Sequence, residues 1–417
     1  MKIYFKKMSD LIWTDVNNVE LENDIFSFAG ISAGLKDSSR KDLALILAPK
    51  DSICSGFFTQ SIVRASCINI CEERINNSSG LVRAILINSG QANACTGELG
   101  MKDSLLATKE LARLLGIKED QVLICSTGVI GVPIPISNLM KHLPALVDKL
   151  NENNFYDASE AILTTDLVPK RIAIETLIEG RRIKISAIAK GSGMIYPNMA
   201  TMLAFLTCDV GIEKNIWDSI IYDAVQTSFN AITVDGETST NDAFIAINSG
   251  ENLDHKYLNI IKQGVNYACQ TLAKSIARDG EGANCLLEVV VEGASNDLDA
   301  LKIARSITNS PLVKTAINGS DPNWGRIISA AGNSGVKFVL DDFDLLIGPY
   351  QILKKGKLIK FDKALVKSYM RLKMNGEYLV DDTLQITINL NSGYGKGKSW
   401  GCDLSKKYIE INSEYTT

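Results

Sequence analysis

The spacing of hydrophobic and polar positions along the chain predicts a mixture of strands and helices. Runs of apolar residues predict buried strands at residues 42–48, 82–87, 121–125, 202–206 and 286–291. Residues 182–189 alternate polar with apolar positions, which is typical of a half-buried strand. Because the run at 202–206 has no charged position, we expect that strand to be covered on both faces.

Two helices are predicted among these strands. Residues 103–115 repeat apolar positions on one face, with Asp103 near the expected N-terminal cap and Gly116 just past the end. A second helix is expected at 255–278, before a glycine-rich loop at 279–283. Strands and helices that are mixed throughout, with no repeat and no obvious linker, favour a layered α/β sandwich.

The composition is that of a soluble globular protein with a sizeable core. The chain has 417 residues, of which 46% are hydrophobic, and its formal net charge is -4. This mild acidity argues against nucleic-acid binding, which needs a basic surface. No apolar run reaches the about 18 residues of a membrane span, and residues 1–16 lack the apolar stretch of a signal peptide. We therefore expect a cytoplasmic protein without a membrane span.

The numbers and positions of cysteine and histidine limit the kinds of catalytic site that the chain can form. The nine cysteines are scattered, which favours reduced thiols over a disulfide scaffold. Cys67 and Cys71 lie four residues apart but have no second pair and no histidine nearby, so no metal site is expected. The only two histidines are His142 and His255. A nucleophile that depends on a histidine base is therefore disfavoured, and we expect another group to be the base.

The most unusual segment is KGSGMIYPNMATML at residues 190–203. Two glycines permit a tight turn after a strand, and Pro197 then stiffens the chain before Ala200, Thr201 and a buried strand. In this layout the Thr201 hydroxyl can attack the carbonyl of Ala200, and water can hydrolyse the resulting ester. The cut frees an α-amine with a pKa of about 8, which can activate the hydroxyl without a histidine. The residues alone leave open a simpler interpretation, a glycine turn followed by a strand that begins with threonine.

The same segment, together with many other blocks in one order, resembles the family of ornithine acetyltransferases, also called glutamate N-acetyltransferases, of arginine biosynthesis. Members of this family carry a KGxGMIxPNMATML-type motif and are cut before its threonine. The other matching blocks are residues 40–45, 88–97, 126–131, 163–166, 233–242, 279–283, 321–326, 400–404 and 412–417. The resemblance covers most of the chain and implies that the cleavage site lies between Ala200 and Thr201, with Thr201 as the nucleophile.

The resemblance also implies roles for residues outside this segment. It assigns the oxyanion hole to Thr127 and Gly128, where a strand that turns at Thr-Gly can aim a hydroxyl and a backbone N–H at one point. An ordinary turn is the alternative there. Lys190 matches a substrate-site residue, which would pair with a substrate carboxylate or lower the pKa of the new Thr201 amine. A solvated lysine at a strand end is the alternative for Lys190.

Further substrate contacts are implied in three separate parts of the chain. Thr164 and Thr165 match a substrate-contacting element, in which we favour Thr164 without separating the two. Glu281 matches the acidic residue that meets the cationic δ-ammonium of the substrate. Asn412 and Thr417 match contacts at the C-terminus, for which a frayed chain end is the alternative.

The chain departs from the family's pattern at a few positions. Asn284 and Cys285 stand where the family usually has Thr-Lys, which puts the contacts beside Glu281 in doubt. Gln91 replaces the more common asparagine, and Glu237 replaces the more common aspartate. Within the threonine element, a simple turn or helix cap would also explain the aspartate at position 166.

The fold and reaction follow from the resemblance. It implies a four-layer αββα sandwich of the kind shared with some self-cleaving aminopeptidases. Cleavage would give an α chain, residues 1–200, and a β chain, residues 201–417, which stay associated and form an α2β2 heterotetramer. Thr201 would take the acetyl group of N2-acetylornithine and pass it to glutamate in a ping-pong reaction. No metal or organic cofactor is implied, and whether acetyl-CoA is also a donor stays open.

Two other functions remain compatible with the sequence. One is a self-activating amidohydrolase or aminopeptidase of the same fold, in which water replaces glutamate as the acceptor. The other is a non-catalytic binding protein that retains the fold. Acetyl release without glutamate would indicate the first, and a chain that stays intact and binds ligand without turnover would indicate the second.

Overall fold

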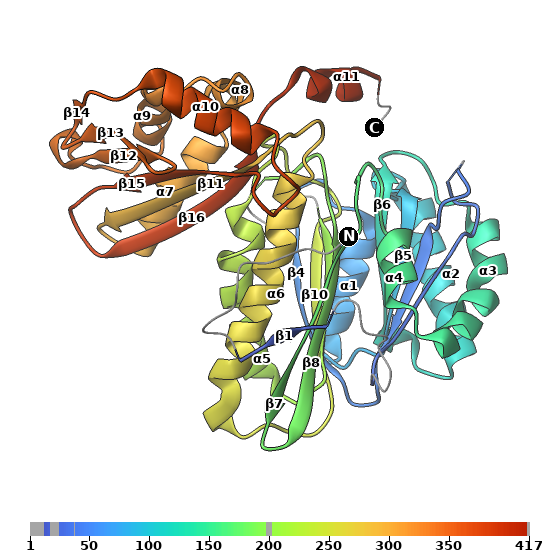
Figure 1. The fold of residues 1–417 in the computed structure, drawn as a ribbon. Coiled ribbons are helices and arrows are strands. Elements are labelled where there is room, and N and C mark those ends of the chain that lie inside the picture. Colours follow the sequence, from blue (N-terminus) through green and yellow to red (C-terminus); the bar gives the residue numbers. More distant parts are fainter. Residues whose placement is uncertain (1–11, 17–24, 37, 197–201, 415–417) are drawn as a thin grey trace.

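Three β-sheets organise the protein in the computed structural model, which describes residues 12–16, 25–36, 38–196 and 202–414 (Figure 1). The central sheet has the strand order β1 (Thr14–Asp15), β7 (Lys170–Ile178), β8 (Arg181–Lys190), β9 (Leu203–Cys208), β10 (Ala243–Asn248) and β4 (Ile53–Phe58). The N-terminal sheet has the order β2 (Ser27–Ile31), β3 (Leu43–Leu47), β5 (Ala84–Gln91) and β6 (Val122–Val129).

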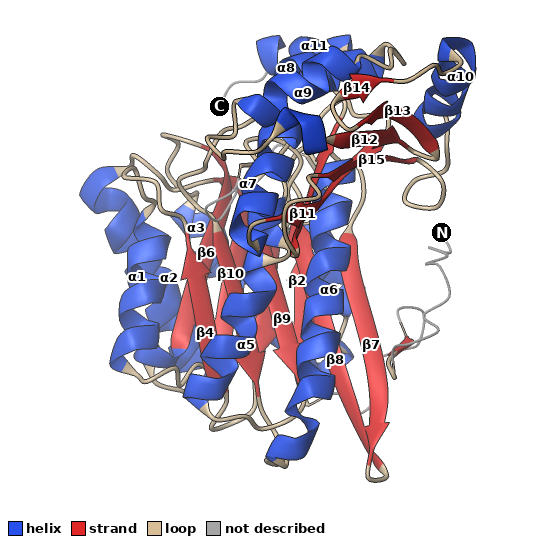
Figure 2. Ribbon diagram, turned by 90° about the vertical axis from the view of Figure 1, so that its left-hand side faces the viewer, coloured by secondary structure: helices blue, strands red, loops and turns tan. Residues whose placement is uncertain are grey.

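The two sheets and their helices form four layers. Helices α5 (Lys214–Gln226) and α6 (Leu258–Arg278) pack on the central sheet, and α2 (Gly97–Leu115) and α3 (Ile136–Asp148) pack on the N-terminal sheet (Figures 1 and 2). Two further helices, α1 (Ser66–Asn77) and α4 (Phe155–Ala161), contact strands of both sheets. The αββα arrangement that the resemblance implied is therefore confirmed for this part of the chain.

Strand β9 shows how the two sheets share a core. Its residues Leu203 and Phe205 belong to the core that contains the N-terminal sheet, whereas Ala204 and Leu206 face the core under α5 and α6. All six residues of β9 are buried. The prediction of a strand covered on both faces is thus confirmed: residues 203–206 are all apolar, and the buried Thr207 hydroxyl donates to the carbonyl of Ser186.

A third sheet forms a separate unit beyond one end of the sandwich (Figure 1). Its strand order is β14 (Lys357–Leu358), β13 (Tyr350–Lys354), β12 (Asp344–Ile347), β15 (Thr383–Asn389), β11 (Leu286–Ala294) and β16 (Gly395–Cys402). A hydrophobic core of its own joins this sheet to α7 (Asp297–Thr308), α8 (Pro311–Asn318), α9 (Trp324–Gly332) and α10 (Lys363–Met374). The sequence predicted β11 but not the rest of the unit.

The remaining predicted elements are confirmed with shifted ends. Helix α2 starts at Gly97, so Asp103 is a buried residue within the helix and not its cap, which corrects the prediction. Gly116 ends α2 with a φ of 66°, as its C-terminal position predicted. Strand β6 extends to Val129, so Thr127 and Gly128 lie inside the strand and not in a turn after it.

Helix α11 (Lys406–Glu414) returns from the C-terminal unit and lies over the end of the sandwich (Figure 1). All nine cysteines are free thiols, and only Cys95 is exposed. Within the described ranges, no helix is long and apolar enough to cross a membrane.

Candidate active site

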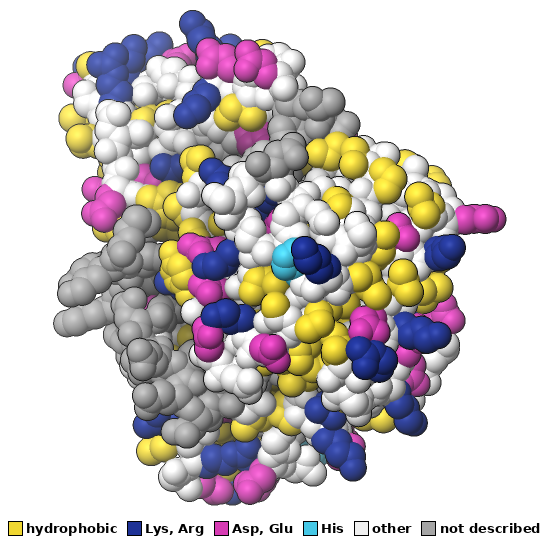
Figure 3. Space-filling view, turned by 90° about the vertical axis from the view of Figure 1, so that its right-hand side faces the viewer, with side chains coloured by type: hydrophobic (Ala, Val, Ile, Leu, Met, Phe, Trp, Pro, Cys, Tyr) yellow, Lys and Arg dark blue, Asp and Glu magenta, His cyan; other side chains and the backbone are white. Residues whose placement is uncertain are grey.

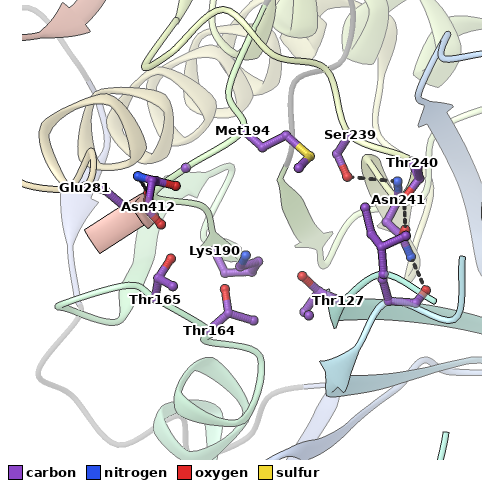
Figure 4. Close-up of a pocket in the computed structure, with 14 residues that line it drawn as sticks. Thr127, Thr164, Thr165, Lys190, Met194, Ser239, Thr240, Asn241, Glu281 and Asn412 are labelled. Atoms are coloured by element: carbon purple, nitrogen blue, oxygen red, sulfur yellow. Dashed lines mark hydrogen bonds between the residues drawn. The ribbon is translucent and has the colours of Figure 1, made fainter. Parts of the chain in front are cut away.

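A pocket lies where α11 meets the end of the sandwich. Its walls come from seven separate parts of the chain: the ends of β5, β6 and β8, the loops after α4 and α6, the loop before β10, and α11 (Figure 4). The lining residues are Ala92, Thr127, Gly128, Ile130, Thr164, Thr165, Lys190, Gly193, Met194, Ser239, Thr240, Asn241, Glu281 and Asn412. Every described residue that the resemblance implicated is therefore brought to this one pocket.

The end of β6 supplies Thr127 and Gly128 to the pocket wall. The strand runs parallel to β5, with Thr127 opposite Ser89 and Gly128 opposite Gly90. Gly128 has a φ of 129°, and a Cβ at this position would lie 2.3 Å from the carbonyl carbon of Gly90. Only glycine fits this conformation and this close approach. Thr127 and Gly128 thus reach the pocket from within a strand, and the oxyanion role that the resemblance implies for them stays a prediction.

Lys190 is the last residue of β8 and is buried in the pocket wall. Its side chain is 5% exposed, and its Nζ lies 3.9 Å from Oδ2 of Asp166. Burial lowers the pKa of Lys190, while the Asp166 carboxylate opposes that change. The alternative of a solvated lysine is therefore wrong.

Asp166 connects Lys190 to a buried network of charges. Its Oδ1 accepts hydrogen bonds of 2.6 Å from both Lys170 Nζ and the backbone N–H of Gly191. Lys170 Nζ also donates to Asp279 Oδ2 at 2.6 Å, and the side chains of both aspartates and Lys170 are at most 1% exposed. Burial alone would raise the pKa of Asp166, but Lys170 and Lys190 together hold it well below its usual range.

The same aspartate fixes the threonine loop. Oδ2 of Asp166 accepts a hydrogen bond of 3.0 Å from the backbone N–H of Thr164. Both Thr164 and Thr165 line the pocket, so either hydroxyl has access to a ligand (Figure 4). Asp166 does make a turn contact, as the simpler interpretation held, but it also joins the threonine loop to the end of β8.

Glu281 and Asn412 face each other across the pocket mouth. Asn412 Nδ2 donates a hydrogen bond of 2.8 Å to Glu281 Oε2. The Glu281 carboxylate lies over Gly193, where a Cβ would come within 2.7 Å of it. Helix α11 is held in place by Ser405, whose hydroxyl donates to the carbonyl of Gly282 at 2.7 Å. Asn412 therefore belongs to a docked helix and not to a frayed end, whereas Thr417 lies outside the described residues.

The predicted cleavage site, Ala200 and Thr201, also lies outside the described residues, but both of its flanks are held by one loop. Upstream, the Asp235 carboxylate accepts hydrogen bonds from the backbone N–H groups of Met194 (2.6 Å) and Ile195 (2.9 Å). Downstream, Asp242 Oδ1 accepts from the N–H of Met202 at 3.0 Å. The two carboxylates therefore anchor the chain on either side of residues 197–201.

The loop between α5 and β10 contributes further residues to the pocket, for which the sequence had suggested no role. Its Ser239, Thr240 and Asn241 line the pocket. Asn241 ties the loop to the N-terminal sheet, because its Nδ2 donates to the carbonyls of Ala92 (2.6 Å) and Ser126 (2.9 Å). The block at 233–242 matched the family motif, and that match was the signal that could have identified these residues.

Candidate metal ligands do not gather at this pocket. Among the residues whose placement is described, no group of three or more His, Cys, Asp or Glu side chains could hold a metal ion. Cys67 and Cys71 are buried thiols of α1, and burial raises the pKa of Cys67 to about 12. The pocket offers instead a buried cation, a carboxylate and several hydroxyl and amide groups.

Comparison with known proteins identifies close relatives along almost the whole chain. A model of the ArgJ family matches residues 27–417. The arginine biosynthesis bifunctional protein ArgJ of Prochlorococcus marinus subsp. pastoris is 69% identical over 398 residues, which cover 95% of this chain and 99% of that protein. The protein of the same name from a Synechocystis species is 46% identical over 401 residues, covering 94% and 96%.

Two solved structures are also similar. The arginine biosynthesis bifunctional protein of Bacillus halodurans is 39% identical with a TM-score of 0.46, and the match covers 50% of this chain and 97% of that one. The ornithine acetyltransferase of Mycobacterium tuberculosis, solved in complex with ornithine, is 32% identical with a TM-score of 0.38, covering 42% and 91%.

Proposed function

The chain belongs to the ArgJ family of arginine-biosynthesis acetyltransferases, and we propose that it moves the acetyl group of N2-acetylornithine to glutamate through an ester on Thr201. We propose acetyl-CoA as a second donor, in keeping with the name "bifunctional" that its relatives carry. The observation that carries this proposal is the pocket, which gathers the oxyanion pair, Lys190, Glu281 and Asn412 from distant parts of the chain.

The charges of the pocket match the ends of N2-acetylornithine. Lys190 supplies a buried cation for the α-carboxylate, and Glu281 supplies a carboxylate for the δ-ammonium. The acetyl carbonyl then lies towards Thr127 and Gly128, where a hydroxyl and a backbone N–H stabilise the oxyanion. Losing one such donor typically costs about 100- to 1,000-fold in rate.

The chemistry proceeds without a histidine, since none lines the pocket among the described residues. The α-amine of Thr201 takes the hydroxyl proton as Oγ attacks the acetyl carbonyl. The tetrahedral intermediate collapses, the N2–acetyl bond breaks, and the leaving ornithine amine receives that proton. In the second half the amine of glutamate attacks the acetyl ester and passes a proton to the Thr201 α-amine. The amine returns that proton to Thr201 Oγ as the ester bond breaks, and N-acetylglutamate departs.

Self-cleavage between Ala200 and Thr201 would leave two chains that share the central sheet. Strand β8 belongs to residues 1–200 and β9 to residues 201–417, and the two pair antiparallel from Ile185–Cys208 to Lys190–Leu203. Separating the chains would expose this ladder and the cores on both sides. This pairing supports an α chain and a β chain that stay associated after the cut.

We propose that two such pairs form an α2β2 heterotetramer in the cytoplasm. The face formed by α2 and α3 carries many hydrophobic side chains (Figure 3), among them the exposed Leu99, Leu105 and Leu106 of α2. Clustered apolar side chains on a surface are typical of an interface between proteins. This face is a candidate contact between the two copies.

The ping-pong scheme predicts a stable half-reaction. Mixed with N2-acetylornithine and no glutamate, the protein is expected to release about one equivalent of ornithine per active site and to gain one acetyl group. Intact mass analysis should place that acetyl group on the fragment that begins with Thr201. Continued ornithine and acetate release without glutamate would instead indicate an amidohydrolase, and ligand binding without any ornithine release would indicate a binding protein.

Replacing Gly193 with alanine is expected to weaken substrate binding while leaving the fold intact. The added Cβ would lie 2.7 Å from the Glu281 carboxylate, which is the movable end of a flexible side chain and must shift. We expect KM for N2-acetylornithine to rise about tenfold, the equivalent of one lost contact of about 1.4 kcal/mol. Gly319→Ala is the matched control, because its Cβ would meet no atom closer than 3.6 Å. Equal kinetics for the two variants would contradict the role of Glu281.

A further inference from the structure

A second cleft lies on the other side of the segment that precedes the cleavage site. It is bounded by α7, the start of α8, the end of α9 and Tyr196. The lining residues are Tyr196, Lys302, Arg305, Ser306, Asn309, Ser310, Pro311, Ala330, Asn333 and Ser334. This lining contains two cations and no carboxylate, so the cleft is chemically suited to an anion.

Arg305 is the central feature of this cleft. Its guanidinium makes no hydrogen bond or ion pair with the residues that the structure describes, and its Nε is buried without a partner. Burial lowers the pKa of Arg305, and Tyr196 is the one group that acts against this change. Arg305 is half-buried and lines the cleft, so its guanidinium, with one buried N–H left without a partner, has hydrogen-bonding capacity for an anionic ligand there.

Several other polar groups of the cleft can donate hydrogen bonds, although the Ser306 hydroxyl already donates to the carbonyl of Ala330 at 2.6 Å. Asn309 Oδ1 accepts from the Thr233 hydroxyl at 2.9 Å, which leaves its NH2 group as a donor. Ser310 Oγ accepts from the N–H of Val313 at 3.4 Å, so its own proton is free to donate. Lys302 adds a second cation at the rim, 3.7 Å from Asp299 and 49% exposed. Donors of this kind around an arginine are suited to phosphate oxygens.

The cleft and the active-site pocket share one short segment as a wall. Met194 lines the pocket and Tyr196 lines the cleft. Two residues apart in the chain, their Cα atoms are separated by at most about 7 Å. Asn309 also reaches the loop that holds this segment, since a Cβ on Gly236 would lie 3.1 Å from its Oδ1. A ligand in the cleft is therefore close to the chain that leads to residue 201.

We propose that this cleft binds the phosphate groups of a CoA-type acetyl donor. The proposal rests on the proposed function, in which acetyl-CoA is a second donor. Such a donor differs from N2-acetylornithine by phosphates that lie far from the acetyl group, whereas Lys190 lies inside the pocket that holds the acetyl end. The phosphates therefore need a second cationic site beside the pocket, and Arg305 with Lys302 supplies it.

Arg305→Ala in the full, processed protein tests this assignment. We expect KM for acetyl-CoA to rise at least tenfold, while the kcat/KM for N2-acetylornithine stays within twofold of the wild type. Arg305→Lys should give an intermediate KM, because lysine keeps the charge but loses the guanidinium fork. Arg371→Ala is the control, because it removes an exposed arginine of α10 that lines neither the pocket nor the cleft. It should leave the kinetic constants for both acetyl donors unchanged.

Calorimetric titration with CoA and with inorganic phosphate completes the test. CoA should bind the wild type and bind Arg305→Ala at least tenfold more weakly, and inorganic phosphate should bind much more weakly than CoA. Equal affinity for the two ligands, or equal loss of both donor reactions in Arg305→Ala, would overturn the proposal. Wild-type protein that uses N2-acetylornithine but neither binds CoA nor uses acetyl-CoA would also overturn it and leave the ornithine reaction standing. Failure with both donors would refute the proposed function itself.

Discussion

Replacing Thr201 with alanine is expected to leave one intact chain of 45.4 kDa where the wild type gives two fragments. Alanine has no hydroxyl to attack the Ala200 carbonyl, and without the cut no α-amine forms at residue 201. Acetyl transfer should therefore fall by at least about 10,000-fold, the scale seen when a nucleophile is removed from an enzyme. Denaturing mass analysis and the glutamate-dependent release of ornithine measure the two effects separately.

Thr201→Ser provides the matched variant, because it keeps the hydroxyl and the amine. We expect it to be cut and to retain measurable transfer. The alanine variant should still fold, since Met202 N–H and the β8–β9 ladder do not depend on the threonine side chain. A melting temperature close to that of the wild type would establish this. Two fragments from Thr201→Ala would refute Thr201 as the cleavage nucleophile.

The sequence could predict the sandwich because its strands carry strong local signals. The run at 202–206 and the alternation at 182–189 give β9 and β8 directly, and their pairing builds the central sheet. The C-terminal unit lacked such signals. Strands β12, β13 and β14 have five residues or fewer, and β11 pairs with β15, about a hundred residues later in the chain. Short strands joined over long separations leave little periodicity to detect.

The candidate site, like the fold, could be predicted from the sequence only in part. Gly128 and Lys190 were identified from motif blocks, and the structure explains both through close backbone approach and burial. The charges around Lys190 could not be predicted, because Lys170 lies outside the matched blocks and its partner Asp279 is 109 residues away in the chain. Their importance depends on burial, which only the packed chain reveals.

Lys170→Met is expected to be among the most destabilising single changes in the protein. It leaves the carboxylates of Asp166 and Asp279 buried with one fewer cation, and breaking a buried pair in this way costs about 3 to 5 kcal/mol of unfolding free energy. Lys41→Met is the matched control, because Lys41 bonds two carboxylates at 2.6 and 2.8 Å but is 31% exposed. A partly exposed cluster of this kind is worth about 1 kcal/mol or less.

The pH dependence of stability shows whether Lys170→Met destabilises the protein by removing a compensating charge or by removing packing contacts. In the wild type the pKa of Asp166 is depressed and that of Lys170 is raised, against burial, by their mutual attraction. The stabilisation from Asp166 is therefore present above its ordinary pKa of about 3.9 and is lost as pH falls through its folded value. The stabilisation from Lys170 is present below the ordinary lysine pKa of about 10.4. It is lost as the pH rises through the pKa of Lys170 in the folded protein.

In Lys170→Met the two aspartates can escape the uncompensated charge only by taking up a proton. Its stability deficit should therefore be largest near pH 7 and should shrink as the pH is lowered towards 5, as measured by thermal melting of both proteins. Adding Asp279→Asn should recover part of the deficit at pH 7, because it removes the second carboxylate while Lys190 still faces Asp166. A deficit that neither acid nor Asp279→Asn reduces would mean that Lys170 stabilises the protein by packing and not by balancing the charges of Asp166 and Asp279.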